Sequence, residues 1–256
     1  MRVLAACRVP VVLVIACATA ATAQSRFGGW GQTELSYDGQ LTFVRLGWRD
    51  GTYGSPTAGG GVNFWLHEFP RAEQNLMSAV GDFTLIDART DGSLLMTLGD
   101  PELFKHPIVT MWEPGFWTMT EEEALALRQY LQKGGFVIFN DFEGPQWANF
   151  EAQTKRVIPG AQWLRLDDTH PVFDTFFRLE DTAIHAPNPL NHHLRGRSPE
   201  YFGLFEDNDP SRRMMAIANY NTNLGEYWQT PEFYAPDALS RAFGLGVNYM
   251  IYGMTH

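Results

Sequence analysis

A strand–helix–strand unit in the middle of the chain limits the possible folds more than any other feature. The apolar run 107–112 and the apolar run 136–139 both have the length and composition of buried strands. Between them, Thr120 and Glu123 have the spacing of a capping box, and Gly134 lies where a left-handed helix end is needed. Two strands joined by a helix are expected to be parallel, with a right-handed connection.

Polar residues follow both strands of this unit directly. Trp112 and Glu113 stand at the end of the first strand, and Asn140, Asp141 and Glu143 stand at the end of the second. Parallel strands end at the same edge of a sheet, and open α/β sheets usually bind ligands there. Convergent carboxylates can divide the roles of acid and base when their surroundings separate their pKa values. Alternatively, Asn140 or Asp141 caps the next helix, because both are favoured N-cap residues.

The two carboxylates after the second strand are expected to differ in role. If the strand continued straight, Asp141 and Glu143 would point to the same side and crowd each other. Gly144 and Pro145 favour a turn instead. We therefore expect Asp141 to point into the crevice beside Trp112 or Glu113, and Glu143 to act partly as cap or dipole partner of the next helix.

The rest of the chain predicts one α/β domain over residues 41–256 with a mostly parallel central sheet. Nothing in this range indicates a domain boundary or an internal repeat. Strands are expected at residues 41–48, 162–166 and 214–220, and helices over residues 72–80, 147–157 and 239–254.

The first 23 residues have the pattern of an export signal, and residues 24–40 form a polar lead. The apolar run Val9–Ala18 is short for a membrane span, and Ala21–Ala23 offers a small-x-small cleavage site before Gln24. We expect simple secretion to the bacterial periplasm or beyond. The minor alternative is a lipoprotein anchored through Cys17, since Val14–Cys17 resembles a lipoprotein box.

Removal of this segment changes the chemistry available to the chain. Cys7 and Cys17 are the two cysteines, so the mature chain has no disulfide, thiolate nucleophile or cysteine metal ligand. With 17 basic and 29 acidic residues left, the net charge is about −12, which disfavours nucleic acid and anionic membranes as partners. Gly59–Gly61 lacks the spacing of a phosphate loop and is interpreted as a flexible loop. We expect no cofactor.

Two histidine-containing loops and several tryptophans are weaker candidates. His170 and His192 lie near oxygen ligands but without a recognised metal-ligand spacing, so turns are favoured and no metal is predicted. Trp65 and Trp112 lie where a loop or strand meets the ligand edge. Aromatic faces beside carboxylates suit sugar binding, although most tryptophans simply bury area.

Several longer stretches carry a family resemblance that covers nearly all of residues 41–256. They read MWEPGFWTMTEEEALALRQYLQKGGFVIFNDFEG, THPVFDTFF, GLFEDNDPSRRMMAIANYN and GVNYMIYGMTH. The chain resembles the bacterial domain of unknown function (DUF) 4159 family. The resemblance implies a class I glutamine amidotransferase-like fold, a flavodoxin-like three-layer sandwich. Glutaminases of that fold use a cysteine that the mature chain lacks, so no catalytic residue is carried over.

Three functions remain open from the sequence. The leading hypothesis is an exported, non-glutaminase domain that binds a small molecule, a carbohydrate or an envelope protein at the carboxyl edge of its sheet. Its candidate ligand-binding residues are Trp65, Trp112, Glu113, Asp141, Glu143 and His170. The alternative is a carboxylate-dependent hydrolase of carbohydrate or cell-wall material, with or without a metal at His170 or His192. The third possibility is a purely structural envelope subunit.

Overall fold

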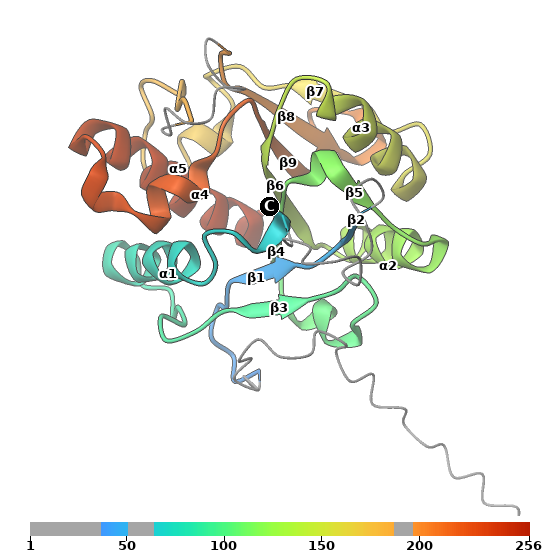
Figure 1. Ribbon diagram of the computed structural model, residues 1–256, viewed down its shortest axis with the longest axis horizontal. Helices are drawn as coiled ribbons and strands as arrows, with labels where there is room; N and C mark the ends of the chain where they lie inside the picture. The colour runs from blue at the N-terminus through green and yellow to red at the C-terminus, as the bar shows by residue number, and fades with distance from the viewer. Residues whose placement is uncertain (1–36, 51–63, 187–196) are drawn as a thin grey trace, which may run out of the picture.

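The computed structural model describes residues 37–50, 64–186 and 197–256. The expected export segment, the glycine-rich loop at Gly59–Gly61 and His192 lie outside the described residues. A seven-stranded sheet forms the centre of the molecule (Figure 1). In spatial order its strands are β3 (Leu94–Met96), β1 (Val44–Leu46), β4 (Ile108–Trp112), β6 (Phe136–Phe142), β9 (Met214–Tyr220), β8 (Glu200–Phe205) and β7 (Trp163–Arg165).

The sheet is mostly parallel, as the sequence predicts. The first five strands in spatial order run parallel, whereas β8 and β7 pair antiparallel at one side. A separate two-stranded antiparallel sheet pairs β2 (Arg49–Asp50) with β5 (Trp117–Thr118). The protein is therefore a mixed α/β fold in which the buried parallel strands are central.

The strand–helix–strand unit is confirmed in detail. β4 and β6 are parallel neighbours in register from Ile108 opposite Phe136 to Trp112 opposite Asn140, and every residue of both strands is buried. The connecting helix α2 (Glu121–Gln132) begins with both hydrogen bonds of the capping box. Gly134 follows the helix with φ of 103°, a left-handed conformation that glycine adopts without a steric penalty.

Helices cover both faces of the sheet. Figure 1 shows α1, α4 and α5 on one side and α2 and α3 on the other. The bounds of the remaining α-helices are α1 (Arg71–Phe83), α3 (Gln146–Val157), α4 (Leu224–Gln229) and α5 (Pro236–Thr255). Six short 3₁₀ helices are described at η1 (Phe64–Leu66), η2 (Pro101–Lys105), η3 (Pro114–Phe116), η4 (Pro171–Phe173), η5 (Glu206–Asn208) and η6 (Pro231–Phe233).

Most elements predicted from apolar patterns are present, with shifted ends at the first strand. The run 41–48 forms a strand only at Val44–Leu46, and Leu41 before it makes an isolated bridge to Ala88. None of the helices in the described parts of the chain combines the length and apolar character needed to cross a lipid bilayer.

Candidate functional site

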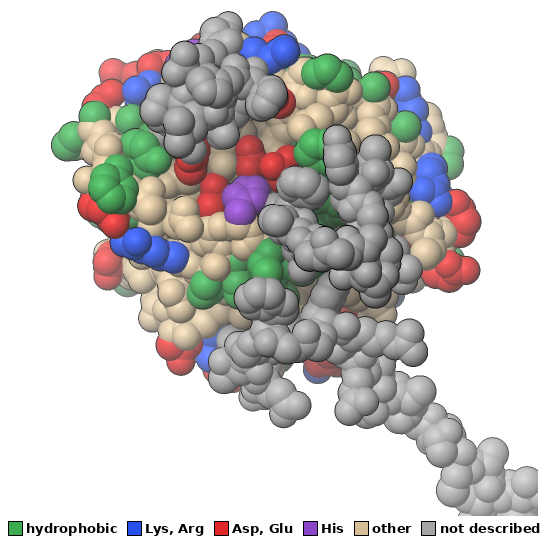
Figure 2. Space-filling model, in the orientation of Figure 1, with side chains coloured by type: hydrophobic (Ala, Val, Ile, Leu, Met, Phe, Trp, Pro, Cys, Tyr) green, Lys and Arg blue, Asp and Glu red, His purple; other side chains and the backbone are tan. Residues whose placement is uncertain are grey.

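Four titratable side chains meet where β4 and β6 end. We call His67, Glu68, Glu113 and Asp141 the carboxyl-edge cluster. The His67 Nε2 atom lies 2.8 Å from Asp141 Oδ2 and 3.7 Å from Glu68 Oε1. One nitrogen or oxygen atom from each of His67, Glu68 and Asp141 lies within 4.8 Å of the other two. Figure 2 shows a histidine among acidic side chains near the middle of the drawn face.

The backbone at all three carboxylates of the cluster is left-handed. Glu68, Glu113 and Asp141 have φ values of 67°, 52° and 62°. Residues other than glycine adopt this region rarely, and such residues concentrate at functional sites. Strand β6 continues to Phe142, with a register shift against β9 after Phe139, and the expected turn follows at Gly144 and Pro145. This bulge turns Asp141 out of the regular ladder.

Buried hydrogen bonds fix the position of the Glu68 carboxylate. The Trp112 Nε1–H group donates to Glu68 Oε2 at 2.8 Å, and the Asn223 amide donates to Glu68 Oε1 at 2.7 Å. Asn140 in turn donates to Asn223 Oδ1 at 3.2 Å. Because both carboxylate oxygens accept a bond from a buried donor, the carboxylate is held in one orientation.

The same network continues into the core. The Asn219 amide donates to Asn140 Oδ1 at 3.3 Å, and the Tyr249 hydroxyl donates to Asn219 Oδ1 at 2.7 Å. Asn140 Oδ1 also accepts a hydrogen bond from the backbone N–H of Leu224 at the start of α4. A chain of buried polar groups therefore links the cluster to α4 and α5.

A buried ion pair anchors the loop that carries His67. Arg45 of β1 pairs with Glu73 of α1, and both side chains are fully buried. Arg45 also donates to the backbone carbonyls of Trp65 at 3.0 Å and His67 at 2.6 Å, and its guanidinium lies 4.0 Å from the centre of the Trp112 ring. The charge of Arg45 is thus already matched by Glu73, although it lies close to the cluster.

The cluster is electrostatically crowded. Burial acts to lower the pKa of His67, but the hydrogen bond to Asp141 and the charges of Asp141 and Glu68 outweigh it and raise that pKa to about 9. Burial raises the pKa of Glu68 to about 7. Burial and the neighbouring charge of Asp141 raise the pKa of Glu113 to about 9. More carboxyl groups are gathered here than the single imidazole can neutralise.

A comparison with protein families matches residues 57–254 to the family described as Domain of unknown function (DUF4159). The chain belongs to the DUF4159 family. The match includes all four residues of the carboxyl-edge cluster. A comparison with curated proteins finds no match.

The DUF4159 domain brings together some of the residues expected at its ligand edge. Glu113 and Asp141 are neighbours in the cluster, as predicted. Trp112 and Trp65 are buried, so neither offers a free ring face to a ligand, and Trp112 supports Glu68 instead. Helix α3 begins after Pro145 without a side-chain cap, so the alternative role of Asp141 or Asn140 as its cap is wrong.

His170 lies away from the cluster, whereas the charge of Glu143 still helps to raise the pKa of the cluster residue Glu113. Glu143 meets the start of α3 through its backbone, accepting the Gln146 amide at 2.9 Å, and its side chain lies 3.8 Å from Arg197. His170 packs against Tyr252, which contacts Phe136 at the beginning of β6. His170 is therefore near the amino edge of the sheet, opposite the cluster.

His67, Glu68 and Asn223 are site residues that the sequence patterns did not reveal. His67 and Glu68 stand between a glycine-rich segment and Pro70, which indicated only an approach to a helix. The only local signal for a site here is a histidine next to a glutamate just before a helix. Asp141, which completes the group, lies 74 positions from His67 in the sequence.

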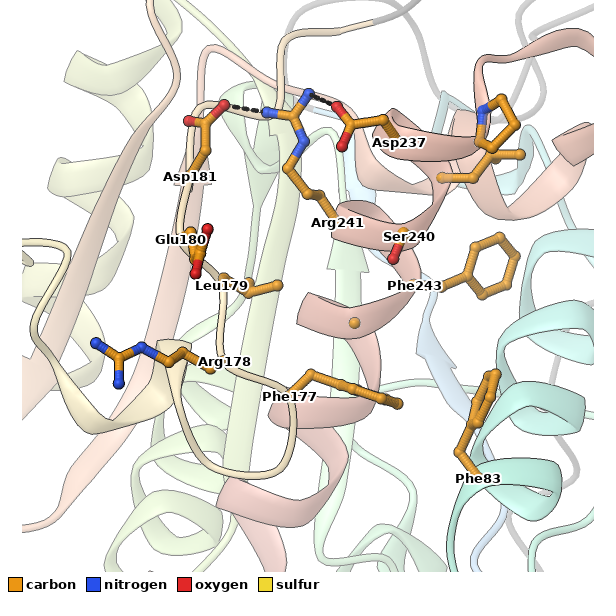
Figure 3. A pocket seen from close by; sticks show the side chains of 13 residues that line it. Phe83, Phe177, Arg178, Leu179, Glu180, Asp181, Asp237, Ser240, Arg241 and Phe243 are labelled. Carbon is orange, nitrogen blue, oxygen red and sulfur yellow. Dashed lines mark hydrogen bonds and ion pairs between the residues drawn. The ribbon is translucent and has the colours of Figure 1, made fainter.

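An open cavity of about 720 Å³ lies in another part of the DUF4159 domain (Figure 3). It is lined by the end of α1, the segment 177–181 and the first turns of α5. Arg241 in its wall forms ion pairs with both Asp181 and Asp237. Arg241 in this cavity is paired with two carboxylates, whereas the two carboxylates of the cluster that lie beside His67 share a single imidazole.

Proposed function

We propose that this DUF4159 domain is an exported, non-glutaminase member of the amidotransferase-like fold that binds a ligand at the carboxyl edge of its sheet. The observation that carries the proposal is the convergence of His67 with Glu68, Glu113 and Asp141 next to two parallel strands, with left-handed backbone at the three carboxylates. Ligands of open α/β sheets usually bind at this edge. The mostly parallel sheet with helices on both faces is compatible with the proposed fold family.

The chemistry of the site favours a ligand that carries positive charge or many hydrogen-bond donors. An ionised carboxylate accepts hydrogen bonds and donates none, and the cluster has three acidic groups but one basic group. His67 is 34% exposed, so the cluster is accessible from solvent. Both cysteines precede residue 18, which leaves no thiolate for glutaminase chemistry at this edge.

A thermal-shift screen of the purified protein against small cationic, polyol and oligosaccharide ligands tests this function. Asp141→Asn should abolish the shift that a binding ligand produces. Asp82→Asn, which changes an exposed carboxylate on α1, is the matched control and should leave the shift intact. Ligand shifts that survive Asp141→Asn would place binding elsewhere in the protein.

The second candidate is a carboxylate-dependent hydrolase of carbohydrate or cell-wall material. It is favoured by the meeting of Glu113 and Asp141 at one edge, because hydrolysis of a glycosidic bond uses two carboxyl groups. The structure gives neither side chain a role as a helix cap. The burial of Trp65 and Trp112 weighs against sugar stacking there. Release of sugars from peptidoglycan fragments, lost in both Glu113→Gln and Asp141→Asn, would support this reaction over simple binding.

A further inference from the structure

We infer that His67, Glu68 and Asp141 form a binding site for a divalent transition-metal ion. The inference deepens the proposed ligand-binding function and rests on it for the location of the site. The three residues offer one imidazole nitrogen and two carboxylate oxygens from two segments far apart in sequence. Zinc sites that bind a substrate or water typically have three protein ligands of these types and an open fourth position.

The distances between the three side chains suit a shared ion. Two ligands that each lie about 2.1 Å from a tetrahedral ion are separated by about 3.4 Å. The distance from His67 Nε2 to Glu68 Oε1 is 3.7 Å, and the distance from His67 Nε2 to Asp141 Oδ2 is 2.8 Å. Both distances from His67 Nε2 differ from this value by less than 1 Å, and the third pair, Glu68 and Asp141, lies within 4.8 Å, so side-chain rotations could replace the His67–Asp141 hydrogen bond by two bonds to the ion.

The surroundings of Glu68 have the form of an outer shell around a metal ligand. Trp112 and Asn223 each donate a hydrogen bond to one oxygen of the Glu68 carboxylate, and Asn140 orients Asn223. Metal-binding carboxylates are usually held by such partners, which fix their direction before the ion arrives. The left-handed backbone at Glu68 and Asp141 fixes the two ligand-bearing corners in the same way.

The balance of charge also points to a cation. Arg45 is paired with Glu73, and burial raises the pKa of Glu68 even though the charge of Arg45 acts to lower it. Binding of the ion would release the Nε2 proton of His67, and the resulting neutral imidazole and two carboxylates around a divalent ion form an electrically neutral unit. Glu113 adds a further carboxyl group at the same edge.

The type of ligands selects the class of ion. Imidazole suits zinc, iron, nickel and copper, whereas magnesium and calcium prefer sites made of oxygen alone. The chain has no cysteine after residue 17, so the site has no thiolate that would favour a soft ion. We therefore assign the site to a borderline divalent ion and use Zn²⁺ as the probe.

The test is a titration of the purified full-length protein with Zn²⁺ after removal of metals by a chelator. Calorimetry should show one ion bound per chain. His67→Gln and Asp141→Asn should weaken binding at least 100-fold, and Asn223→Ala should weaken it about 10- to 100-fold, as expected for a group that orients a ligand. Asp82→Asn and His256→Gln change exposed residues and serve as matched controls that should bind like the wild type.

Wild-type protein alone gives a second readout that needs no variant to fold. Co²⁺ should occupy the site, produce an intense visible absorption spectrum and be displaced by Zn²⁺. Zn²⁺ binding with full affinity in both His67→Gln and Asp141→Asn would overturn the assignment, as would the absence of binding in the wild type. Preference for Ca²⁺ or Mg²⁺ would overturn the choice of a transition metal.

A parallel ligand screen in excess chelator separates this inference from the proposed function. A ligand shift that depends on Asp141 in chelator, together with no Zn²⁺ binding, would reject the metal and retain the ligand site. Zn²⁺ binding that depends on His67 and Asp141, with no organic ligand found, supports the metal while the broader ligand-binding proposal fails.

Discussion

The buried ion pair between Arg45 and Glu73 should be one of the most sensitive points for stability. Both side chains are 0% exposed, and Arg45 also donates to the carbonyls of Trp65 and His67. Glu73→Gln removes the counter-charge and leaves a buried guanidinium without an ionised partner. Breaking a buried pair in this way costs about 3–5 kcal/mol. Since domains of this kind are stable by roughly 5–15 kcal/mol, the variant should lose a large part of its free energy of unfolding.

Equilibrium unfolding in urea, followed by tryptophan fluorescence, measures this loss. The matched control is Glu232→Gln, which breaks the surface pair between Arg71 and Glu232, whose side chains are 54% and 46% exposed. An exposed pair contributes about 0–1 kcal/mol, so the control should stay close to the wild type. A loss below 1 kcal/mol in Glu73→Gln would refute the idea that Glu73 alone balances the buried charge of Arg45.

A double variant tests the mechanism of the loss. Replacing Arg45 by Met and Glu73 by Leu removes both charges, so it should be more stable than Glu73→Gln alone. Its free energy of unfolding should still be lower than that of the wild type. The backbone carbonyls of Trp65 and His67 no longer accept hydrogen bonds from Arg45, and each unsatisfied carbonyl costs about 1–3 kcal/mol. Full recovery would show that Arg45 does not anchor the loop of the site.

Three further predictions concern single positions and are measured by unfolding in urea. Asn223→Ala should lower the free energy of unfolding by about 2 kcal/mol, because Glu68 loses a buried donor. Glu113→Gly should be more stable than Glu113→Ala by about 1 kcal/mol, since φ is 52° there, and equal stability would contradict this. Burial lowers the pKa of His170, whose Nδ1 accepts the Val172 amide. The stability that neutral His170 contributes should therefore be present above pH 6.5 and be lost as the pH falls below that value. The difference in free energy of unfolding between the wild type and His170→Asn should thus depend on pH.

Local signals were sufficient to predict the centre of the fold. The capping box at Thr120, the glycine after α2 and two apolar runs are contained within about 35 residues, and each has a direct physical meaning. They determine two parallel strands and therefore a shared carboxyl edge. The prediction that Glu113 and Asp141 lie near each other follows from this topology alone.

Elements that depend on distant partners were not predicted. Strand β3 has three residues, and α4 has six, too few for a periodic pattern. Strand β8 contains Gly203, and a glycine inside a segment weakens the sequence pattern of a strand. The glycine is needed because a side chain at this position would collide with Phe205. The approach of His67 and Glu68 to Asp141 also depends on distant partners, namely on the packing of a loop against β4 and β6. The sequence therefore could not reveal it.

The left-handed corners at Glu68, Glu113 and Asp141 affect how fast and how tightly a ligand can be captured. Fixing the backbone of one flexible residue reduces conformational entropy by about 1–2 kcal/mol at room temperature. At these three positions the chain is already confined to one narrow region in the folded protein. A ligand that enters therefore meets carboxylates carried on preorganised backbone, and little of its interaction energy is lost in ordering them. Association should then be limited by diffusion and desolvation, without a slow rearrangement of the chain.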